Sequence, residues 1–250
     1  MDVRIPDRGP TSPFLGARDL FETEYDLELP VYIRIRSDPD ERTRTGHTDD
    51  KHVLTISRHA ATSAMARELA LHEYAHMYRH ECGHPSHRLR TEEAIYLALA
   101  GERVERRKLS HCYQIANHLR DIYADDVTFS VGPTDKLVGC LESGLASAIA
   151  DRPPTAPATW TRRSATSDPE ITAVNAAFAV ALCERHDLLD DDATLYDLAF
   201  AAARDAPGID FDRFRRQFRD LDPNPDTSAF RRTMVSMTRD YCVDSGPAAD

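Results

Sequence analysis

Residues 71–87 read LHEYAHMYRHECGHPSH and hold five of the eleven histidines in the chain. The first of them, His72, is followed by Glu73 and then by His76, which gives the pattern H-E-x-x-H. Residues i and i+4 share one face of an α-helix, so the two imidazoles point to one place, as a bound metal ion requires. Glu73 lies about 100° around the helix, where it can reach a water molecule on that metal. The stretch therefore predicts a Zn²⁺ site with Glu73 as the catalytic general base.

The segments on either side of this stretch predict an α+β fold that is mostly α. VYIRIR (31–36) and HVLTIS (52–57) alternate apolar and polar residues, which is typical of half-buried strands. The segment 61–81 is predicted to be one packed helix, because apolar residues recur along it with helical spacing. We expect a small N-terminal β-sheet packed on this active-site helix, followed by a helical C-terminal part.

The remaining elements follow from periodicity, caps and turn residues. The C-terminal part is predicted to contain helices near 170–187, 194–205, 210–220 and 226–241. Upstream of it we expect helices over 14–27, 92–107, 111–126 and 134–150, a charged loop over 37–50, and a short strand at 127–131 (VTFSV).

Three boundaries divide the chain in this interpretation. Residues 1–150 form a metal-binding domain, and 151–169, with four prolines and the single Trp160, form a linker or extended arm. Residues 170–243 form a helical subdomain, and 244–250 form a disordered tail.

Composition restricts the function classes. The net charge of −11, from 28 Asp and 14 Glu against 28 Arg and 3 Lys, argues against sequence-independent binding of nucleic acid. This excess of Asp with few Lys resembles haloarchaeal cytoplasmic proteins. The chain has no apolar run of about 20 residues, and its first ten residues lack the order of a signal peptide, so we expect a cytoplasmic protein without a membrane span. Five cysteines without a C-x-x-C pair predict reduced thiols.

The strand, the helix and the H-E-x-x-H motif together resemble the zincin metallopeptidases over residues 14–126. The whole sequence also resembles a haloarchaeal family that carries the same motif, which says little about substrate. The zincin resemblance implies hydrolysis of a peptide or protein substrate by zinc-activated water. The alternatives are a zincin-fold protein that binds metal or a protein partner without turnover, a helical protein with a chance motif, and, disfavoured by charge, a nuclease. The oligomeric state is not indicated.

A third metal ligand must come from elsewhere, because the metzincin spacing fails. That pattern needs Gly and His where this chain has Arg79 and Cys82. The stretch DIYAD (121–125) instead resembles the E-x-x-A-D stretch of gluzincins. That resemblance implies that Asp121 binds the metal in place of the usual Glu, and that Asp125 supports a ligand histidine.

Helix periodicity places these carboxylates on one polar face, with Asn117, Asp121 and Asp125 at i, i+4 and i+8 and with His118 beside them. We expect Asn117, His118 and Asp125 to orient the ligands through hydrogen bonds. Other candidates for the third ligand remain open at this stage: Glu93, His84 and His118, with His87 also able to fold back. His80 is expected to be a supporting or surface residue, because three successive turns of a straight helix cannot wrap one metal.

Overall fold

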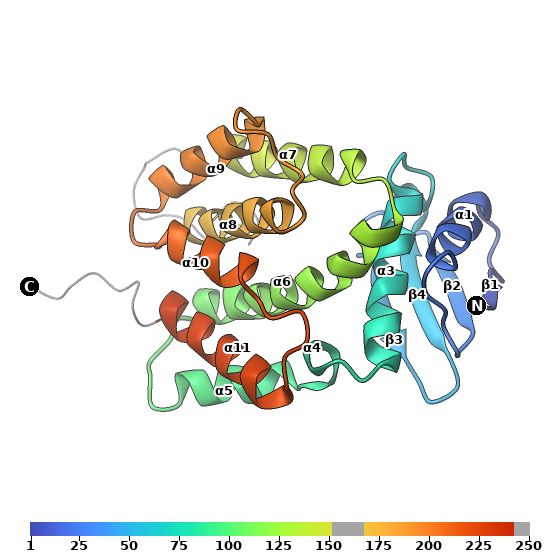
Figure 1. Ribbon diagram of the computed structural model, residues 1–250, viewed down its shortest axis with the longest axis horizontal. Coiled ribbons are helices and arrows are strands. Elements are labelled where there is room, and N and C mark those ends of the chain that lie inside the picture. The colour runs from blue at the N-terminus through green and yellow to red at the C-terminus, as the bar shows by residue number, and fades with distance from the viewer. Residues whose placement is uncertain (152–167, 243–250) are drawn as a thin grey trace, which may run out of the picture. The chain divides into compact units, whose positions relative to one another are not determined.

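The computed structural model describes residues 1–151 and 168–242 (Figure 1). The chain forms two compact units, one made of Met1–Arg88 with Tyr123–Lys136 and the other of Leu89–Ile122 with Leu137–Asp250. The chain therefore passes between the units after residues 88, 122 and 136, whereas the predicted boundary lies near 150. Most of the predicted linker and the whole predicted tail, with Trp160, lie outside the described residues.

The first unit contains a four-stranded sheet in the order β1-β2-β4-β3. The predicted strands are confirmed as β2 (Val31–Arg36) and β4 (His52–Ser57), which pair in parallel. β1 (Val3–Arg4) was not predicted, and β3 (Arg44–His47) lies within the predicted loop. β3 pairs antiparallel with β4 as a short polar edge strand, so its pairing comes from the tight connection and not from apolar alternation.

Four helices belong to this unit beside its share of α6. They are α1 (Ser12–Phe21), α2 (Arg58–Ala61), α3 (Ala66–Glu81) and α4 (Pro85–Arg88). The helix predicted over 61–81 is thus interrupted, because the side chain of Ser57 caps α2 and a turn precedes α3.

The core of the first unit fixes how α3 is rotated. Tyr74 is fully buried in it with Phe14, Phe21, Ile33 and Leu54, and the Tyr74 hydroxyl donates to the carbonyl of Phe14 at 3.2 Å. At 100° per residue, this anchoring places the opposite face of α3, which carries the H-E-x-x-H histidines, away from the core.

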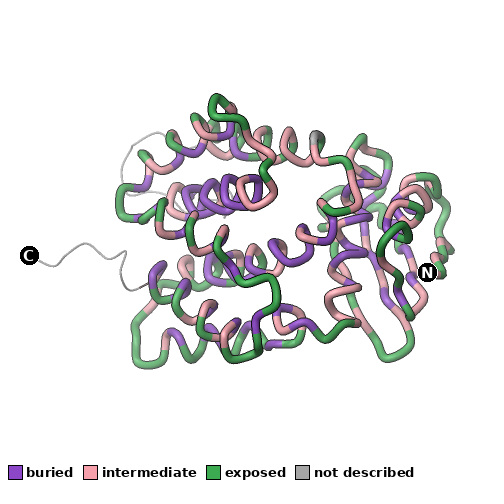
Figure 2. The backbone as a smooth tube through the Cα atoms, in the orientation of Figure 1, coloured by how far each residue is buried: buried purple, intermediate pink, exposed green. Residues whose placement is uncertain are grey.

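The second unit is helical throughout its described part. α8 (Pro169–Arg185) is buried along most of its length (Figure 2), and α9 (Thr194–Asp205) and α10 (Phe211–Arg219) pack on it. α5 (Thr91–Leu99) packs on α11 (Thr227–Cys242), and α7 spans Asp135–Ala150. The predicted class, α+β and mostly α, is confirmed.

Two predicted elements were wrong. The segment 127–131 is not a strand but the last part of α6 (Arg106–Val131), because Val127 joins the core at helical spacing from Ala124. The helix predicted over 92–107 ends at Leu99, and Gly101 with φ of 88° supplies the left-handed residue that lets the chain turn away.

A second group of histidines ties the end of α3 to the sheet. Nε2 of the fully buried His52 lies 2.8 Å from the Glu81 carboxylate, and its Nδ1 lies 2.8 Å from Nδ1 of His47. The ring of His80 stacks on His47 with 3.9 Å between centroids. Glu81 also accepts the backbone N–H groups of residues 28 and 29, so it acts as a structural brace.

This network gives an acid-sensitive step in stability. Burial, reinforced by His80 and His52, lowers the pKa of His47 from 6.5 to about 3. Between those values the unfolded chain takes up a proton that the folded chain does not, so this contribution to stability is present above pH 6.5 and is lost as the pH falls. We expect His47→Asn to lose less unfolding free energy than the wild type over that range, measured by urea denaturation. Equal losses in the two proteins would contradict a neutral, half-buried His47.

Candidate metal centre

Two imidazole nitrogens of α3 converge on one point. The Nε2 atoms of His72 and His76 lie 3.0 Å apart, and the ring planes are inclined at 85°. Two nitrogens on one tetrahedral Zn²⁺, each at 2.0–2.1 Å, lie about 3.3 Å apart. The observed pair is within a few tenths of an ångström of that separation, so small side-chain rotations suffice to hold a metal ion.

Asp125 on α6 fixes the orientation and tautomer of His72. Its carboxylate Oδ1 lies 2.7 Å from His72 Nδ1, and Asp125 is only 6% exposed. A carboxylate accepts hydrogen bonds, so the His72 Nδ1–H donates and leaves a lone pair on Nε2. The predicted hydrogen bond from a motif histidine to Asp125 is therefore present.

His76 is held by a chain of hydrogen bonds that runs into α4. Its Nδ1 lies 2.7 Å from Nε2 of His87, and Nδ1 of His87 lies 2.7 Å from the hydroxyl of Ser86. That hydroxyl lies 2.7 Å from Nδ1 of His84. Gly83, with φ of 68°, turns the chain at the end of α3, and Pro85 begins α4, which carries His87 to the site.

When the imidazole rings are neutral, one backbone N–H group determines which atom donates in each hydrogen bond of the series from His84 to His76. The amide N–H of Ser86 donates to Nδ1 of His84 at 3.3 Å, so that nitrogen is an acceptor. The Ser86 hydroxyl then donates to His84 and accepts from Nδ1–H of His87. Nε2 of His87 is consequently an acceptor for Nδ1–H of His76. This sequence of donors and acceptors leaves a lone pair on His76 Nε2, and that tautomer is the one that binds a metal.

Asp121 supplies a carboxylate to this pair. It lies one turn before Asp125 on the continuous helix α6, so the two side chains share a face. Ligand atoms of His72, His76 and Asp121 all lie within 4.8 Å of one another. This is the group of three potential metal ligands found within residues 1–151 and 168–242. The side chain of Asp121 is 27% exposed, which leaves the position open to solvent.

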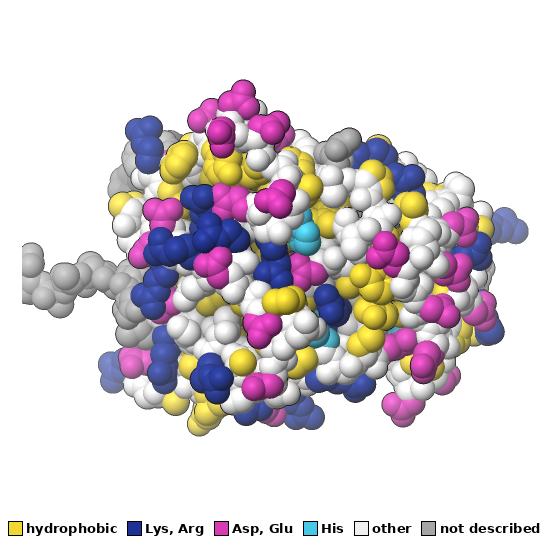
Figure 3. Space-filling view, viewed as in Figure 1, with side chains coloured by type: hydrophobic (Ala, Val, Ile, Leu, Met, Phe, Trp, Pro, Cys, Tyr) yellow, Lys and Arg dark blue, Asp and Glu magenta, His cyan; other side chains and the backbone are white. Residues whose placement is uncertain are grey.

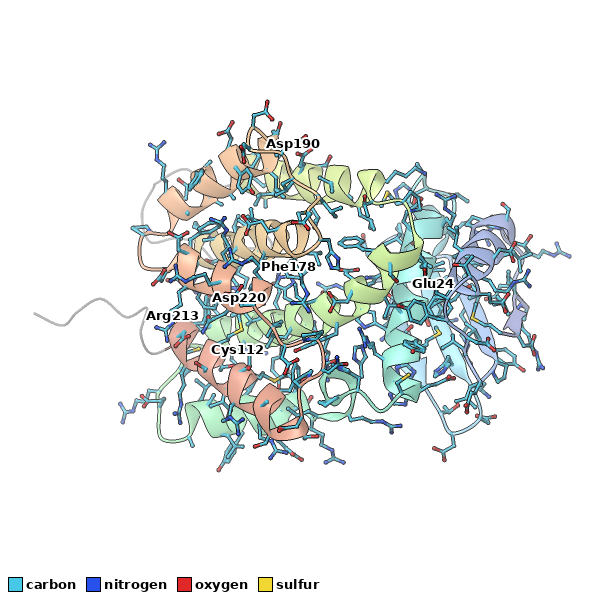
Figure 4. The ribbon with its side chains drawn as sticks, viewed as in Figure 1. Glu24, Cys112, Phe178, Asp190, Arg213 and Asp220 are labelled. Carbon is cyan, nitrogen blue, oxygen red and sulfur yellow. The ribbon has the colours of Figure 1, made fainter. Side chains whose placement is uncertain are left out.

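His118 lies beside Asp121 and is held by the helices of the second unit. Its Nδ1 is 3.8 Å from Asp121 Oδ2, and its Nε2 is 2.8 Å from Oδ1 of Asn175. The ring stacks on Phe178 of α8, labelled in Figure 4, with 4.2 Å between centroids. The structure thus places His118 next to the Asp121 carboxylate and outside the group of three candidate ligands.

The other sequence candidates are not brought into the group. Glu93 is 57% exposed and faces Arg90 at 3.9 Å. His80 stacks on His47, and His84 is linked to the site through the hydroxyl of Ser86. Asn117 was expected to orient a ligand, but it is exposed and makes no hydrogen bond to a described residue. The described residues therefore provide no contact through which Asn117 would orient a ligand. It lies two turns before Asp125 on α6, about 12 Å along the axis.

Glu73 is buried but chemically available. It is 7% exposed and makes no hydrogen bond or ion pair with any residue that the structure describes. Its carboxylate is therefore not committed to a structural contact. Ser86 is the residue that sequence reasoning missed; the only signal was the Pro-Ser-His run that follows the helix.

A known protein family matches most of this sequence. A model described as a family of unknown function, DUF5781, matches residues 1–243. The chain belongs to the DUF5781 family. No curated protein and no solved structure matches it. Within the described part of this DUF5781 chain, none of the helices has the length and apolar character needed to cross a membrane.

The ligand set predicts a graded response to substitution. Asp121→Ala should weaken Zn²⁺ binding by more than roughly 100-fold, because it would remove the third candidate ligand, whereas Asp125→Ala removes the partner of a candidate ligand and should cost roughly 10–100-fold. Glu93→Ala, an exposed carboxylate outside the group, is the control and should change nothing. Competition titration with a chromophoric chelator measures all three. A larger loss for Glu93→Ala than for Asp121→Ala would reassign the third ligand.

The hydrogen-bond order predicts a smaller effect at Ser86. Ser86→Ala removes the hydroxyl that sets the tautomer of His87, so zinc affinity should fall by less than the roughly 10–100-fold expected for a direct partner. Ser86→Thr keeps the hydroxyl and should restore binding. Ser130→Ala, a hydroxyl removed elsewhere in the same unit, should bind zinc as the wild type does. Identical zinc affinities for the Ser86→Ala and wild-type proteins would show that the hydrogen bonds from Ser86 through His87 do not affect metal binding by His76.

Proposed function

We propose that this protein is a zinc-dependent metallopeptidase of the zincin type. The observation that carries the proposal is the pair of Nε2 atoms 3.0 Å apart on an H-E-x-x-H helix, with Asp121 within reach of both. The donor set, two neutral imidazoles and one carboxylate, is a known arrangement for catalytic zinc and leaves one position open.

The residues fit that ion by their chemistry. His72 and His76 each present a nitrogen lone pair, because Asp125 and His87 accept their Nδ1 protons. Asp121 would complete the ligand set as a carboxylate. Bound zinc supplies a Lewis acid that polarises a carbonyl and lowers the pKa of water toward 7.

Proton transfer falls to Glu73. Its carboxylate would take the proton of the attacking water and return it to the nitrogen of the leaving amine, which balances the hydrolysis of one amide bond. The absence of a structural partner for Glu73 among the described residues supports this role, since a committed carboxylate would be a poor base. Asp125 and the His87–Ser86 chain hold the imidazoles still during the reaction.

Glu73→Gln separates catalysis from metal binding. The amide keeps the shape of the side chain but accepts no proton, so hydrolysis of fluorescently labelled casein in concentrated KCl should fall by about two orders of magnitude or more. Zinc content should stay at one ion per chain. The matched control Glu93→Gln makes the same change on an exposed carboxylate and should keep full activity.

The outcomes distinguish the competing functions. Loss of activity with retained zinc supports the peptidase. Zinc bound by the wild type without hydrolysis of any peptide supports a non-catalytic metal-binding protein of the same fold. Activity that survives Glu73→Gln contradicts the mechanism.

A further inference from the structure

A second candidate site lies wholly within the second unit, between α5 and α11. A cavity of about 760 Å³ opens there, lined on one side by the end of α5 and on the other by α11. Its apolar lining includes Leu97 and Val235, and Leu97 remains 49% exposed. Nothing in the proposed peptidase chemistry uses this cavity.

Three arginines of α11 surround the cavity. Arg231, Val235 and Arg239 follow one another at i, i+4 and i+8, so one face of the helix lines the space, with Arg232 beside them. Arg232 donates to the hydroxyl of Ser228 at 2.9 Å, and Arg239 donates through Nε to the carbonyl of Ala98 at 3.1 Å. Each of these contacts uses one of the five N–H groups that a guanidinium carries.

No carboxylate of a described residue lies within 4.0 Å of any of the three guanidinium groups. In addition, Nε of Arg231 is buried and has no hydrogen-bond acceptor among the described residues. A buried donor without an acceptor is costly, so an acceptor from outside the chain would relieve it.

The acidic residues at the cavity do not neutralise this charge. Asp240 is 8% exposed, and its two oxygens accept hydrogen bonds from Arg213, labelled in Figure 4, and from Gln217 at 2.7 Å. Glu102 is the other acidic residue of the lining, and it is exposed without an ion pair to the described residues. Figure 3 shows Lys and Arg side chains over α10 and α11, with Asp and Glu side chains among them.

We propose that this cavity binds a small organic anion that carries a carboxylate or phosphate group and a short apolar chain. The guanidinium groups offer planar pairs of donors that match either oxyanion. Leu97 and Val235 would cover the apolar chain. The proposal does not depend on zinc or on peptidase activity, because every residue in it belongs to α5, α11 or the loop after α5.

Calorimetric titration of the full-length protein at fixed KCl concentration tests the proposal with four probes. Sodium hexanoate and hexyl phosphate carry both features, inorganic phosphate carries only the oxyanion, and hexan-1-ol carries only the chain. We expect saturable one-site binding of hexanoate or hexyl phosphate, with inorganic phosphate weaker and hexan-1-ol without binding. The tighter of the two hexyl probes identifies the oxyanion.

Variants connect the binding to this cavity. Arg231→Gln and Arg232→Gln should each weaken the better probe by about tenfold, the scale of a lost charge-assisted hydrogen bond. Arg204→Gln, which removes the same charge from an exposed position of α9, should bind as the wild type does. Circular dichroism confirms that each variant is folded, and Arg232 is exposed, so its replacement leaves the packing of α11 intact. No saturable binding of either hexyl anion, or equal losses in the Arg204 and Arg231 variants, would overturn the proposal.

Discussion

The hydrogen bond between His72 and Asp125 is the contact on which the candidate centre depends. The two residues are 53 positions apart in sequence, and their side chains meet at 2.7 Å with Asp125 almost completely buried. This contact joins α3 to α6, and the bond from Arg79 Nε to the carbonyl of Tyr123 at 2.7 Å joins the same two helices. Gly132, just past α6, permits the close approach, since a Cβ there would lie 2.7 Å from a methyl group of Leu71. With α6 fixed in this way, the carboxylate one turn earlier, that of Asp121, reaches the histidine pair.

α3 shows how one helix can serve stability and chemistry together. Tyr74 and Ala70 on one side lie fully buried in the core, while His72 and His76 on the other side face a hydrogen-bonded shell. The shell is costly to assemble, because a half-satisfied polar network is less stable than an apolar core. Nδ1 of His72 and Nδ1 of His76, which point away from the shared position, each have a partner, so the convergence of the two Nε2 atoms is the part of the arrangement that a metal would complete.

Local patterns predicted the parts of the structure that depend on local physics. The helical spacing of His72 and His76 is fixed by the turn of a helix, and β2 and β4 alternate in polarity because one side of each is buried. The prediction of a strand at 127–131 was wrong. Its β-branched residues favour strands, but Val127 is buried as part of a long helix. The edge strand β3 carries no apolar alternation, since its formation depends on pairing with β4. The role of Ser86 could not be read from sequence, because it depends on how the backbone turns at Gly83 between α3 and α4.

The site itself was partly predictable. Asp121 was proposed from a motif in which Asp stands in place of Glu, and its ligand atoms lie within reach of both histidines. Asn117 was predicted to contribute because it lies on the same polar face of α6. It is exposed, because a face longer than two turns extends beyond the histidine pair. Helix periodicity thus gave the face that carries Asp121 and Asp125 together with further residues, and only the three-dimensional arrangement shows which of them come close to the histidines.

The X-ray absorption spectrum of the zinc-loaded protein at the zinc edge tests the central claim most directly. The arrangement predicts only nitrogen and oxygen ligands at about 2.0–2.2 Å, with the outer-shell scattering of two imidazole rings. The Asp125→Asn protein should keep two imidazoles, since Asp125 is not a ligand. Sulfur at about 2.3 Å, or the scattering of three or more imidazoles, would contradict a centre built from His72, His76 and Asp121.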